Sequence, residues 1–349
     1  MAKVRILVVD DSVVVRRLVA GVLEEDPALE VVGTAPNGRI ALAKVEQLAP
    51  DLVTLDIEMP EMDGLTALAR MRKEHKDVKV IMFSVLTERG ALHTLDALSL
   101  GAVDYVTKPA RKAGREEALR SIREKLVPRI HAICCPAEMG PASAAADQRR
   151  GAAPESPAVI AVAASTGGPD AVPRLLQALP GDFGLPILIV QHMPALFTRL
   201  FARRLDAQVA LPVAEAADAT SLDGGGVWIA PGGMHLVVER SRAGLGLATQ
   251  HGPAELSCRP SANVLFRSVA RHYGPGALAV VLTGMGRDGL EGCREIRRAG
   301  GRVLAQDQAS SVVWGMPGFV VEAGLADSAL KPEDLAREIT YLACGVGQR

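Results

Sequence analysis

An unbroken apolar segment, Val159–Ala164, runs directly into Ser165-Thr166-Gly167-Gly168-Pro169 and constrains the possible folds strongly. A short apolar run without alternation is typical of a buried parallel strand. The two glycines allow a tight turn with exposed backbone N–H groups, and Pro169 suits the first turn of a helix. Ser165 is therefore expected where a strand ends beside a helix N-terminus. Such a position suits a nucleophile, an anion-binding turn or an ordinary turn.

The length of 349 residues predicts two domains with separate cores. A formal net charge of -1 argues against a broad nucleic-acid surface. No apolar run reaches the roughly 18 residues of a membrane-spanning helix, and the early Asp10-Asp11 pair argues against a secretory signal. The five cysteines lack metal-ligand spacing and are expected to be reduced thiols. We expect a cytoplasmic monomer that neither binds nucleic acid nor inserts into a membrane.

Residues 1–130 alternate strand-like and helical patterns and are expected to form the first domain. Strands are expected over residues 4–9, 30–34, 51–56, 78–84 and 102–106. This alternation predicts an α/β, flavodoxin-like domain with a doubly wound, five-stranded parallel sheet. In such a sheet the functional crevice lies at the carboxyl ends of the strands.

Polar side chains fall at those strand ends. They are Asp10, Asp11, Asp56, Ser84 and Lys108. Three carboxylates form a hard-oxygen site suited to Mg²⁺, and a lysine is a natural counter-charge. Each acid alone is typical of a solvated loop, but their place on successive strand ends favours a cation site.

Three motifs resemble the receiver domain of two-component response regulators over about residues 3–125. They are Val9–Ser12, Leu55–Gly64 and Thr107–Pro109. The resemblance implies that Asp56 is the phosphoacceptor for a histidine kinase. It also implies that Asp10 and Asp11 help Asp56 to hold Mg²⁺.

The same resemblance implies a phosphoryl switch around the acceptor. Ser84 would hydrogen-bond the phosphoryl group, Lys108 would pair with it, and Tyr105 matches the switch aromatic. A cis Lys108–Pro109 peptide bond is expected as well.

Residues 131–157 are expected to be a flexible linker. From about Cys134 the composition changes to Ala, Pro, Gly and Ser, without aromatic or β-branched residues. A helix over residues 116–130 should close the first domain. Because a short tether keeps the receiver near the second domain, we expect it to inhibit that domain until Asp56 is phosphorylated.

Residues 158–345 are expected to form a second, mostly parallel α/β domain with a β-hairpin over 236–248. Ser165, His192 and Asp288 follow the ends of three separate strands, which converge on one crevice in an open sheet. This arrangement suits a triad in which Ser165 attacks, His192 is the base and Asp288 orients it. His235 and His251 remain rival bases.

Four motifs resemble the catalytic domain of the chemotaxis protein-glutamate methylesterase (CheB) family over residues 157–343. They are Ala164–Pro169, Gln191–Pro194, Ala230–Gly233 and Leu282–Gly289. The resemblance implies hydrolysis of glutamyl methyl esters on methyl-accepting chemoreceptors, deamidation of receptor glutamines, and no cofactor for the esterase. It assigns the triad as above, with Thr166 and Met285 lining the oxyanion site.

Two other classes of protein are alternatives to an esterase. A DNA-binding response regulator is disfavoured because the second half lacks a basic helix-turn-helix pattern. A phosphorylation-dependent binding or regulatory protein of another chemosensory array would need an inert hydrolase-like domain, yet all three triad candidates are present. Release of methanol from a methylated receptor separates the esterase from both.

Overall fold

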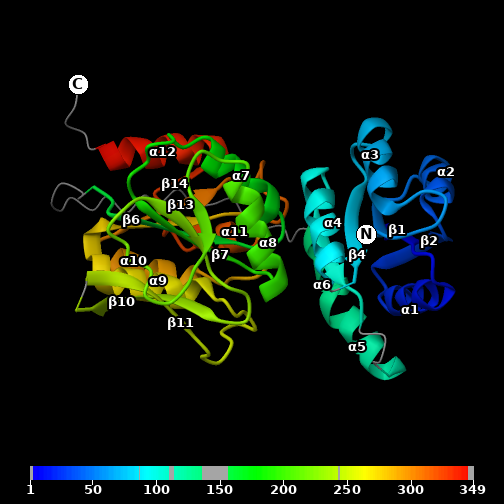
Figure 1. Cartoon of the computed structure of the whole chain (residues 1–349). Helices are drawn as coiled ribbons and strands as arrows, with labels where there is room; N and C mark the ends of the chain where they lie inside the picture. The colour runs from blue at the N-terminus through cyan, green and yellow to red at the C-terminus, as the bar shows by residue number, and fades with distance from the viewer. Residues whose placement is uncertain (1–2, 86, 110–113, 136–155, 243, 345–349) are drawn as a thin grey trace. The chain divides into compact units, whose positions relative to one another are not determined.

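The computed structural model describes residues 3–85, 87–109, 114–135, 156–242 and 244–344. The chain forms two compact units, Met1–Ala137 and Glu138–Arg349, each with a parallel sheet and flanking helices (Figure 1). The two-domain α/β architecture expected from the sequence is thus present. None of the described helices is long and apolar enough to cross a membrane.

The first unit has a five-stranded, wholly parallel sheet in the order β2-β1-β3-β4-β5. Its strands are β1 (Val4–Val9), β2 (Leu29–Ala35), β3 (Leu52–Asp56), β4 (Lys79–Ser84) and β5 (Asp104–Thr107). Its helices are α1 (Val13–Glu24), α2 (Gly38–Leu48), α3 (Gly64–Glu74), α4 (Glu88–Ser99), α5 (Arg115–Lys125) and α6 (Val127–Cys134). The strand order is that of a doubly wound, flavodoxin-like sheet, as predicted.

The helices that follow β1, β3 and β4 begin at side chains that cap them. Ser12, Asp63 and Thr87 each accept a hydrogen bond from a backbone N–H of the first turn of α1, α3 and α4. Each cap satisfies a backbone donor that the helix itself leaves unpaired. The caps therefore fix where each helix starts. They also fix the length of the short loops between strand and helix, which carry the polar residues.

The last helical region of this unit differs from the single helix predicted over 116–130. It consists of α5 and α6, with Pro128 at the first turn of α6, where its missing N–H costs nothing. Helix α6 continues to Cys134 because Ile130 and Ile133 are buried. Residues 131–134 of the expected linker are thus helical. Most of that linker, 136–155, lies outside the described residues.

The cis Lys108–Pro109 bond expected from the resemblance is not found. Among the described residues only the Arg259–Pro260 bond is cis. The trans form of an X–Pro bond is favoured by about 0.5–1 kcal/mol unless surrounding contacts select cis. Lys108 reaches its acidic partners without the cis bond.

The second unit has a seven-stranded, wholly parallel sheet in the order β14-β13-β12-β6-β7-β9-β8. Its strands are β6 (Val159–Ala164), β7 (Pro186–Gln191), β8 (Val213–Glu215), β9 (Gly226–Ile229), β12 (Ala277–Val281), β13 (Arg302–Gln306) and β14 (Ser328–Leu330). The predicted hairpin is β10 (His235–Ser241) paired antiparallel with β11 (Gly244–Gln250). The helices are α7 (Gly168–Gln177), α8 (Ala195–Asp206), α9 (Ala262–Tyr273), α10 (Leu290–Arg298), α11 (Met316–Glu322) and α12 (Pro332–Cys344), with a 3-10 turn at Gly274–Gly276.

Strand β6 lies between β12 and β7 at the centre of this sheet, and all three strands are wholly buried. Their lack of polar alternation follows from burial on both faces. The residues that follow these strands therefore emerge side by side at one edge: Ser165 after β6, His192 after β7, and the loop from Leu282 after β12.

Candidate active site

Ser165 is held by its backbone at the end of β6. Its N–H donates to Thr283 O at 3.1 Å, and its carbonyl accepts from Gly168 N at 2.8 Å and from Gln191 Nε2 at 2.9 Å. Gln191 is 1 % exposed, so this contact is shielded from water. The backbone of Ser165 is thus fixed from both neighbouring strands.

Two glycines provide the space around Ser165. A Cβ on Gly284 would lie 2.8 Å from Ser165 Cβ. A Cβ on Gly168 would lie 2.0 Å from Gln191 Oε1. Side chains at either position would push against the serine or its support, so these glycines are required by close approach.

His192, which is partly buried, pairs with the buried Asp288 beside the end of β6 that carries Ser165. Nε2 of His192 lies 2.8 Å from Asp288 Oδ2, with the His192 side chain 14 % and the Asp288 side chain 2 % exposed. The His192 N–H donates to Ala164 O, the residue before Ser165. An ionised Asp288 accepts a hydrogen bond from the Nε2–H group, which leaves Nδ1 as the nitrogen with the free lone pair. Among the described residues, Ser165 Oγ makes no hydrogen bond to His192. Such catalytic bonds often tighten only with substrate.

Asp288 is anchored at the N-terminus of α9. Its carboxylate accepts hydrogen bonds from Ala262 N at 2.7 Å, Asn263 N at 3.1 Å and the Ser261 hydroxyl at 2.8 Å. Asn263 Oδ1 in turn accepts from Gly289 N at 3.0 Å. Asp288 therefore supplies the acceptor that the first N–H groups of the helix lack, and benefits from the helix dipole.

These contacts set the protonation of the pair. Burial lowers the pKa of His192, but the hydrogen bond to Asp288 and the thiol of Cys258 outweigh it and raise the pKa to about 9. Burial raises the pKa of Asp288, but hydrogen bonding and charge from His192, with the bonds from Ala262 and Ser261, hold it below its ordinary value. An ionised carboxylate can thus orient the imidazole and stabilise its protonated form.

The rival histidines lie in other settings. His235 is 2 % exposed; its Nε2 lies 3.0 Å from Pro253 O and its Nδ1 accepts from Ser261 N at 3.2 Å. Both ring nitrogens are therefore used to hold the loop that ends in Ser261. His251 is exposed at the end of the hairpin. The geometry favours His192 as the base.

The oxyanion candidates lie on the two loops that flank Ser165. Thr166 is 5 % exposed, and its carbonyl accepts from the Thr283 hydroxyl at 3.0 Å. Met285 is 36 % exposed, and its N–H donates to no other described residue. An N–H of this kind is available to a developing negative charge on a substrate oxygen.

Cys258 lies against the same histidine and was not singled out from the sequence. Its Sγ is 3.9 Å from His192 Nδ1 and 3.5 Å from Leu256 O. Sequence spacing gave no signal, since Cys258 and His192 are 66 residues apart. All five cysteines are free thiols.

The first unit brings together the predicted phosphorylation residues at the carboxyl edge of its sheet. Lys108 Nζ lies 2.7 Å from Asp10 Oδ2 and 2.8 Å from Asp56 Oδ2. Burial raises the pKa of Asp56 to about 6, because the attraction of Lys108 is partly offset by the charge of Asp10. Burial also raises the pKa of Asp10. The site thus carries more negative charge than one lysine neutralises.

These carboxylates fit a hard cation. Asp10, Asp11 and Asp56 each offer an oxygen within 4.8 Å of the others. Asp10 Oδ2 is buried and, although close to Lys108, has no bond of good hydrogen-bond geometry. Oxygen donors and excess negative charge are what Mg²⁺ prefers.

Ser84 and Tyr105 lie on the adjoining strands. Ser84 is 2 % exposed and accepts a hydrogen bond from the Thr94 hydroxyl at 2.9 Å, in helix α4. Its own hydroxyl is 3.3 Å from Gly90 O. Tyr105 is buried, which raises its pKa. Thr94 was missed from sequence, because its contact depends on how α4 packs.

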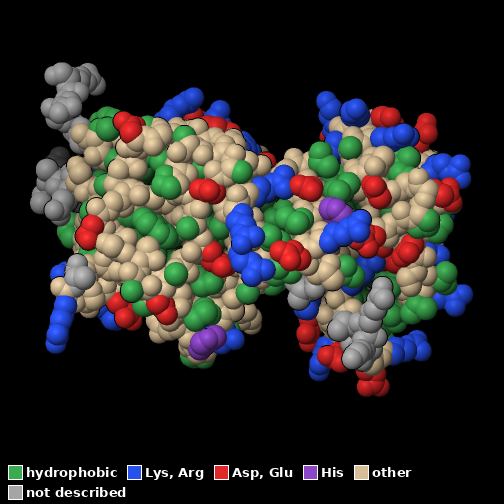
Figure 2. Space-filling model, viewed as in Figure 1, with side chains coloured by type: hydrophobic (Ala, Val, Ile, Leu, Met, Phe, Trp, Pro, Cys, Tyr) green, Lys and Arg blue, Asp and Glu red, His purple; other side chains and the backbone are tan. Residues whose placement is uncertain are grey.

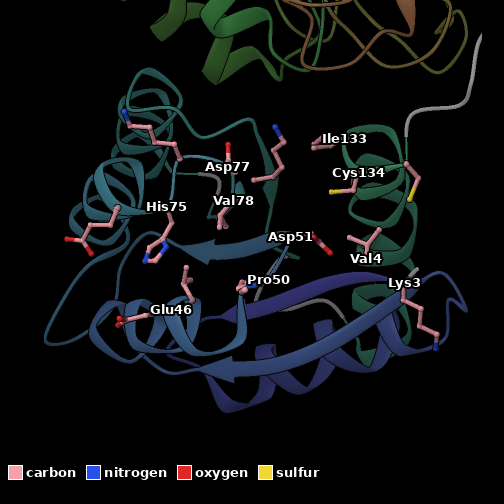
Figure 3. A pocket seen from close by; sticks show the side chains of 16 residues that line it. Lys3, Val4, Glu46, Pro50, Asp51, His75, Asp77, Val78, Ile133 and Cys134 are labelled. Atoms are coloured by element: carbon pink, nitrogen blue, oxygen red, sulfur yellow. The ribbon is translucent and has the colours of Figure 1, made fainter. Parts of the chain in front are cut away.

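A cavity of about 680 Å³ lies at the opposite, amino edge of this sheet. Figure 3 shows Val4, Asp51, His75, Val78 and Cys134 around it. It contains none of the predicted site residues. Basic and acidic side chains are interspersed over the visible face of this unit (Figure 2).

Comparison with known proteins gives two family matches. Residues 160–339 match the model of the CheB methylesterase, and residues 6–120 match that of the response regulator receiver domain. The protein-glutamate methylesterase/protein-glutamine glutaminase of Trichodesmium erythraeum is 50 % identical, over 97 % of this chain and 99 % of the relative. The protein of the same name from Nocardioides sp. is also 50 % identical, over 97 % and 95 %. The Thermotoga maritima CheB methylesterase catalytic domain has 35 % identity and a TM-score of 0.51, covering 53 % of this chain and 98 % of that domain.

The fold and these matches define a response regulator whose second domain is an esterase-type hydrolase. The chain belongs to the CheB methylesterase family.

Proposed function

We propose that this chain removes methyl esters from glutamate side chains of chemoreceptors, and deamidates receptor glutamines, under the control of receiver phosphorylation. The observation that carries the proposal is the His192–Asp288 pair beside Ser165 at the end of the central strand. The names of the relatives supply the substrate class.

In this mechanism Ser165 Oγ attacks the ester carbonyl carbon while His192 Nδ1 takes its proton. Backbone N–H groups stabilise the negative oxygen of the tetrahedral intermediate. The Met285 N–H is a candidate donor, and Thr166 lines the same site. Collapse of the intermediate expels methoxide, which receives the proton from His192 and leaves as methanol. Water then attacks the acyl-serine, His192 accepts its proton and returns it to Ser165 Oγ, and the glutamate carboxylate is released. Asp288 stays ionised throughout.

Receiver domains in general are phosphorylated with Mg²⁺ by a histidine kinase, and we assign this role to the first unit. Asp10, Asp11 and Asp56 would hold the ion, which when bound neutralises phosphoryl oxygens during transfer. Asp56 would accept the phosphoryl group, and Lys108 would pair with it. The Ser84 hydroxyl would give up its hydrogen bond with Thr94 and bind a phosphoryl oxygen instead. The Tyr105 side chain would then change position. The natural site of action would be cytoplasmic, and the chain would act as a monomer.

Ester hydrolysis is tested as methanol released from a methylated receptor. Ser165→Ala should lower kcat at least about a thousandfold, because triad members act as a unit. Ser241→Ala, an exposed serine of the hairpin, is the matched control and should retain activity. Circular dichroism and Asp56 phosphorylation should be unchanged in both. Parent-like turnover of Ser165→Ala would exclude it as nucleophile, and no methanol from the parent would favour a binding protein.

A further inference from the structure

Cys258 and His192 present a soft thiol and an imidazole nitrogen to one another. Cys258 Sγ lies 3.9 Å from His192 Nδ1, and both side chains are partly buried. One ligand atom each from His192, Cys258 and Asp288 lies within 4.8 Å of the others. The proposed esterase mechanism uses Nδ1 but has no role for the thiol.

The distance suits a bridging metal ion. Zn²⁺ binds thiolate sulfur at ~2.3 Å and imidazole nitrogen at ~2.0–2.1 Å, so a tetrahedral angle places the two ligand atoms ~3.6 Å apart. The observed separation of 3.9 Å differs by an amount that a small side-chain rotation removes. Sulfur and imidazole also select Zn²⁺ over Mg²⁺, which prefers oxygen.

Asp288 completes this arrangement from the other side of the ring. Histidines that bind metals almost always donate their second N–H to a carboxylate or carbonyl, which fixes the tautomer and orientation. His192 has this arrangement, since Nε2 lies 2.8 Å from Asp288 Oδ2. The carboxylate that orients the base therefore also prepares Nδ1 for a metal.

We propose that His192 and Cys258 form a Zn²⁺ site that inhibits the esterase reversibly; this rests on the proposed function of His192. Binding replaces the thiol proton, which is released to solvent, by a Zn–S bond, and uses the Nδ1 lone pair for a Zn–N bond. Solvent would complete the coordination. With its lone pair engaged, Nδ1 cannot accept the proton of Ser165, so attack on the ester stops.

Binding is measured apart from activity, with Co²⁺ as the probe. In the full-length protein with saturating Mg²⁺, Co²⁺ should produce a thiolate-to-cobalt charge-transfer absorption, which an all-oxygen site does not give. Cys258→Ser and His192→Asn should each lose this absorption. Cys344→Ser removes an exposed thiol of the same domain and should keep it.

Inhibition is measured as methanol release against Zn²⁺ concentration, with each variant normalised to its own metal-free rate. The parent should be inhibited and recover with EDTA. In Cys258→Ser the Zn²⁺ concentration that halves the rate should rise at least roughly 10- to 100-fold. Loss of a residue that only hydrogen-bonds a metal ligand already lowers metal affinity by about this factor, and loss of the ligand itself should lower it no less. Cys344→Ser should match the parent.

Unchanged Co²⁺ absorption or unchanged Zn²⁺ sensitivity in Cys258→Ser would overturn the proposed site. Retention of the absorption in folded His192→Asn would show that the thiol binds the metal without His192, and this would overturn the proposed two-residue site. If no form releases methanol, the esterase function fails, but the Co²⁺ absorption still decides whether the site exists.

Discussion

Replacement of Asp56 by asparagine should stabilise the receiver domain when Mg²⁺ is absent. Asp56 is 5 % exposed, and burial raises its pKa from 3.8 to about 6 despite the nearby Lys108. At roughly 1.4 kcal/mol per pH unit, folding disfavours the ionised form by about 3 kcal/mol relative to the neutral one. Asparagine resembles the protonated carboxyl group in size and charge, so it removes this cost.

The sign of the pH dependence follows from the raised pKa. The folded domain binds a proton at Asp56 that the unfolded chain has already lost, so the free energy of unfolding of the parent falls as pH rises from about 4 to about 6. Asparagine lacks this slope. The Ile57 N–H and Lys108 face different oxygens of Asp56, and asparagine offers only one oxygen, so one of the two contacts is lost at a cost of about 1 kcal/mol. Lys108 keeps Asp10 at 2.7 Å. The net gain is about 2 kcal/mol near neutral pH and disappears near pH 4.

Thermal unfolding of the full chain in EDTA checks this expectation. The receiver transition of Asp56→Asn should rise by roughly 6–10 °C near neutral pH, while the transition of the catalytic domain should not move. Glu124→Gln on α5 removes an exposed charge and should leave both transitions in place. Equal melting temperatures for parent and Asp56→Asn near neutral pH, or a gain that persists at pH 4, would refute the reasoning.

Three further outcomes concern the catalytic domain. Because His192 must be neutral to act as base and its pKa is raised to about 9, kcat/KM for ester hydrolysis should increase with pH toward about 9; a flat profile above about pH 6 would contradict this. Gly284→Ala would set a Cβ 2.8 Å from Ser165 Cβ and should cost roughly a hundredfold in kcat, whereas Gly224→Ala, with nothing within 4 Å, should be neutral; equal rates would exclude close packing as the reason for glycine. Residues 157–349 alone should hydrolyse ester roughly 5- to 150-fold faster than the unphosphorylated full chain, and phosphodonor should narrow that gap; no difference would mean that the receiver does not inhibit.

The strands and the polar residues at their ends could be predicted because both depend on local sequence. Buried parallel strands need apolar runs, and the caps that start the helices are side chains such as Ser12 and Thr87. The convergence of Ser165 and His192 followed from topology alone, since neighbouring parallel strands end at one edge. The choice of His192 over His235 did not follow, because it depends on contacts with Ser261 and Asp288 that only the folded chain makes.

The long-range contacts around the base were beyond the reach of the sequence pattern. Ser261 and Asp288 are 27 residues apart, and Cys258 and His192 are 66 apart. No periodicity relates such pairs, so the supports of the triad and the nearby thiol become visible only in the structure. The break between α5 and α6 near Pro128 was not predicted for a different reason. A proline within a helical pattern is also found in the first turn of a helix, so its presence alone does not say whether a new helix begins there.

The hydrogen bonds to Asp288 explain how a buried carboxylate can stay ionised and how it affects the pKa of His192. Burial alone would favour the neutral acid, but the first N–H groups of α9 and the Ser261 hydroxyl all donate to it. The same fixed negative charge raises the pKa of His192. The pair therefore stabilises the imidazolium that forms when Ser165 attacks, and at neutral pH it leaves only a minor fraction of His192 in the neutral form that starts the reaction. A change that lowers the His192 pKa, such as Cys258→Ala, should raise the rate near neutral pH, provided that Asp288 keeps the ring oriented.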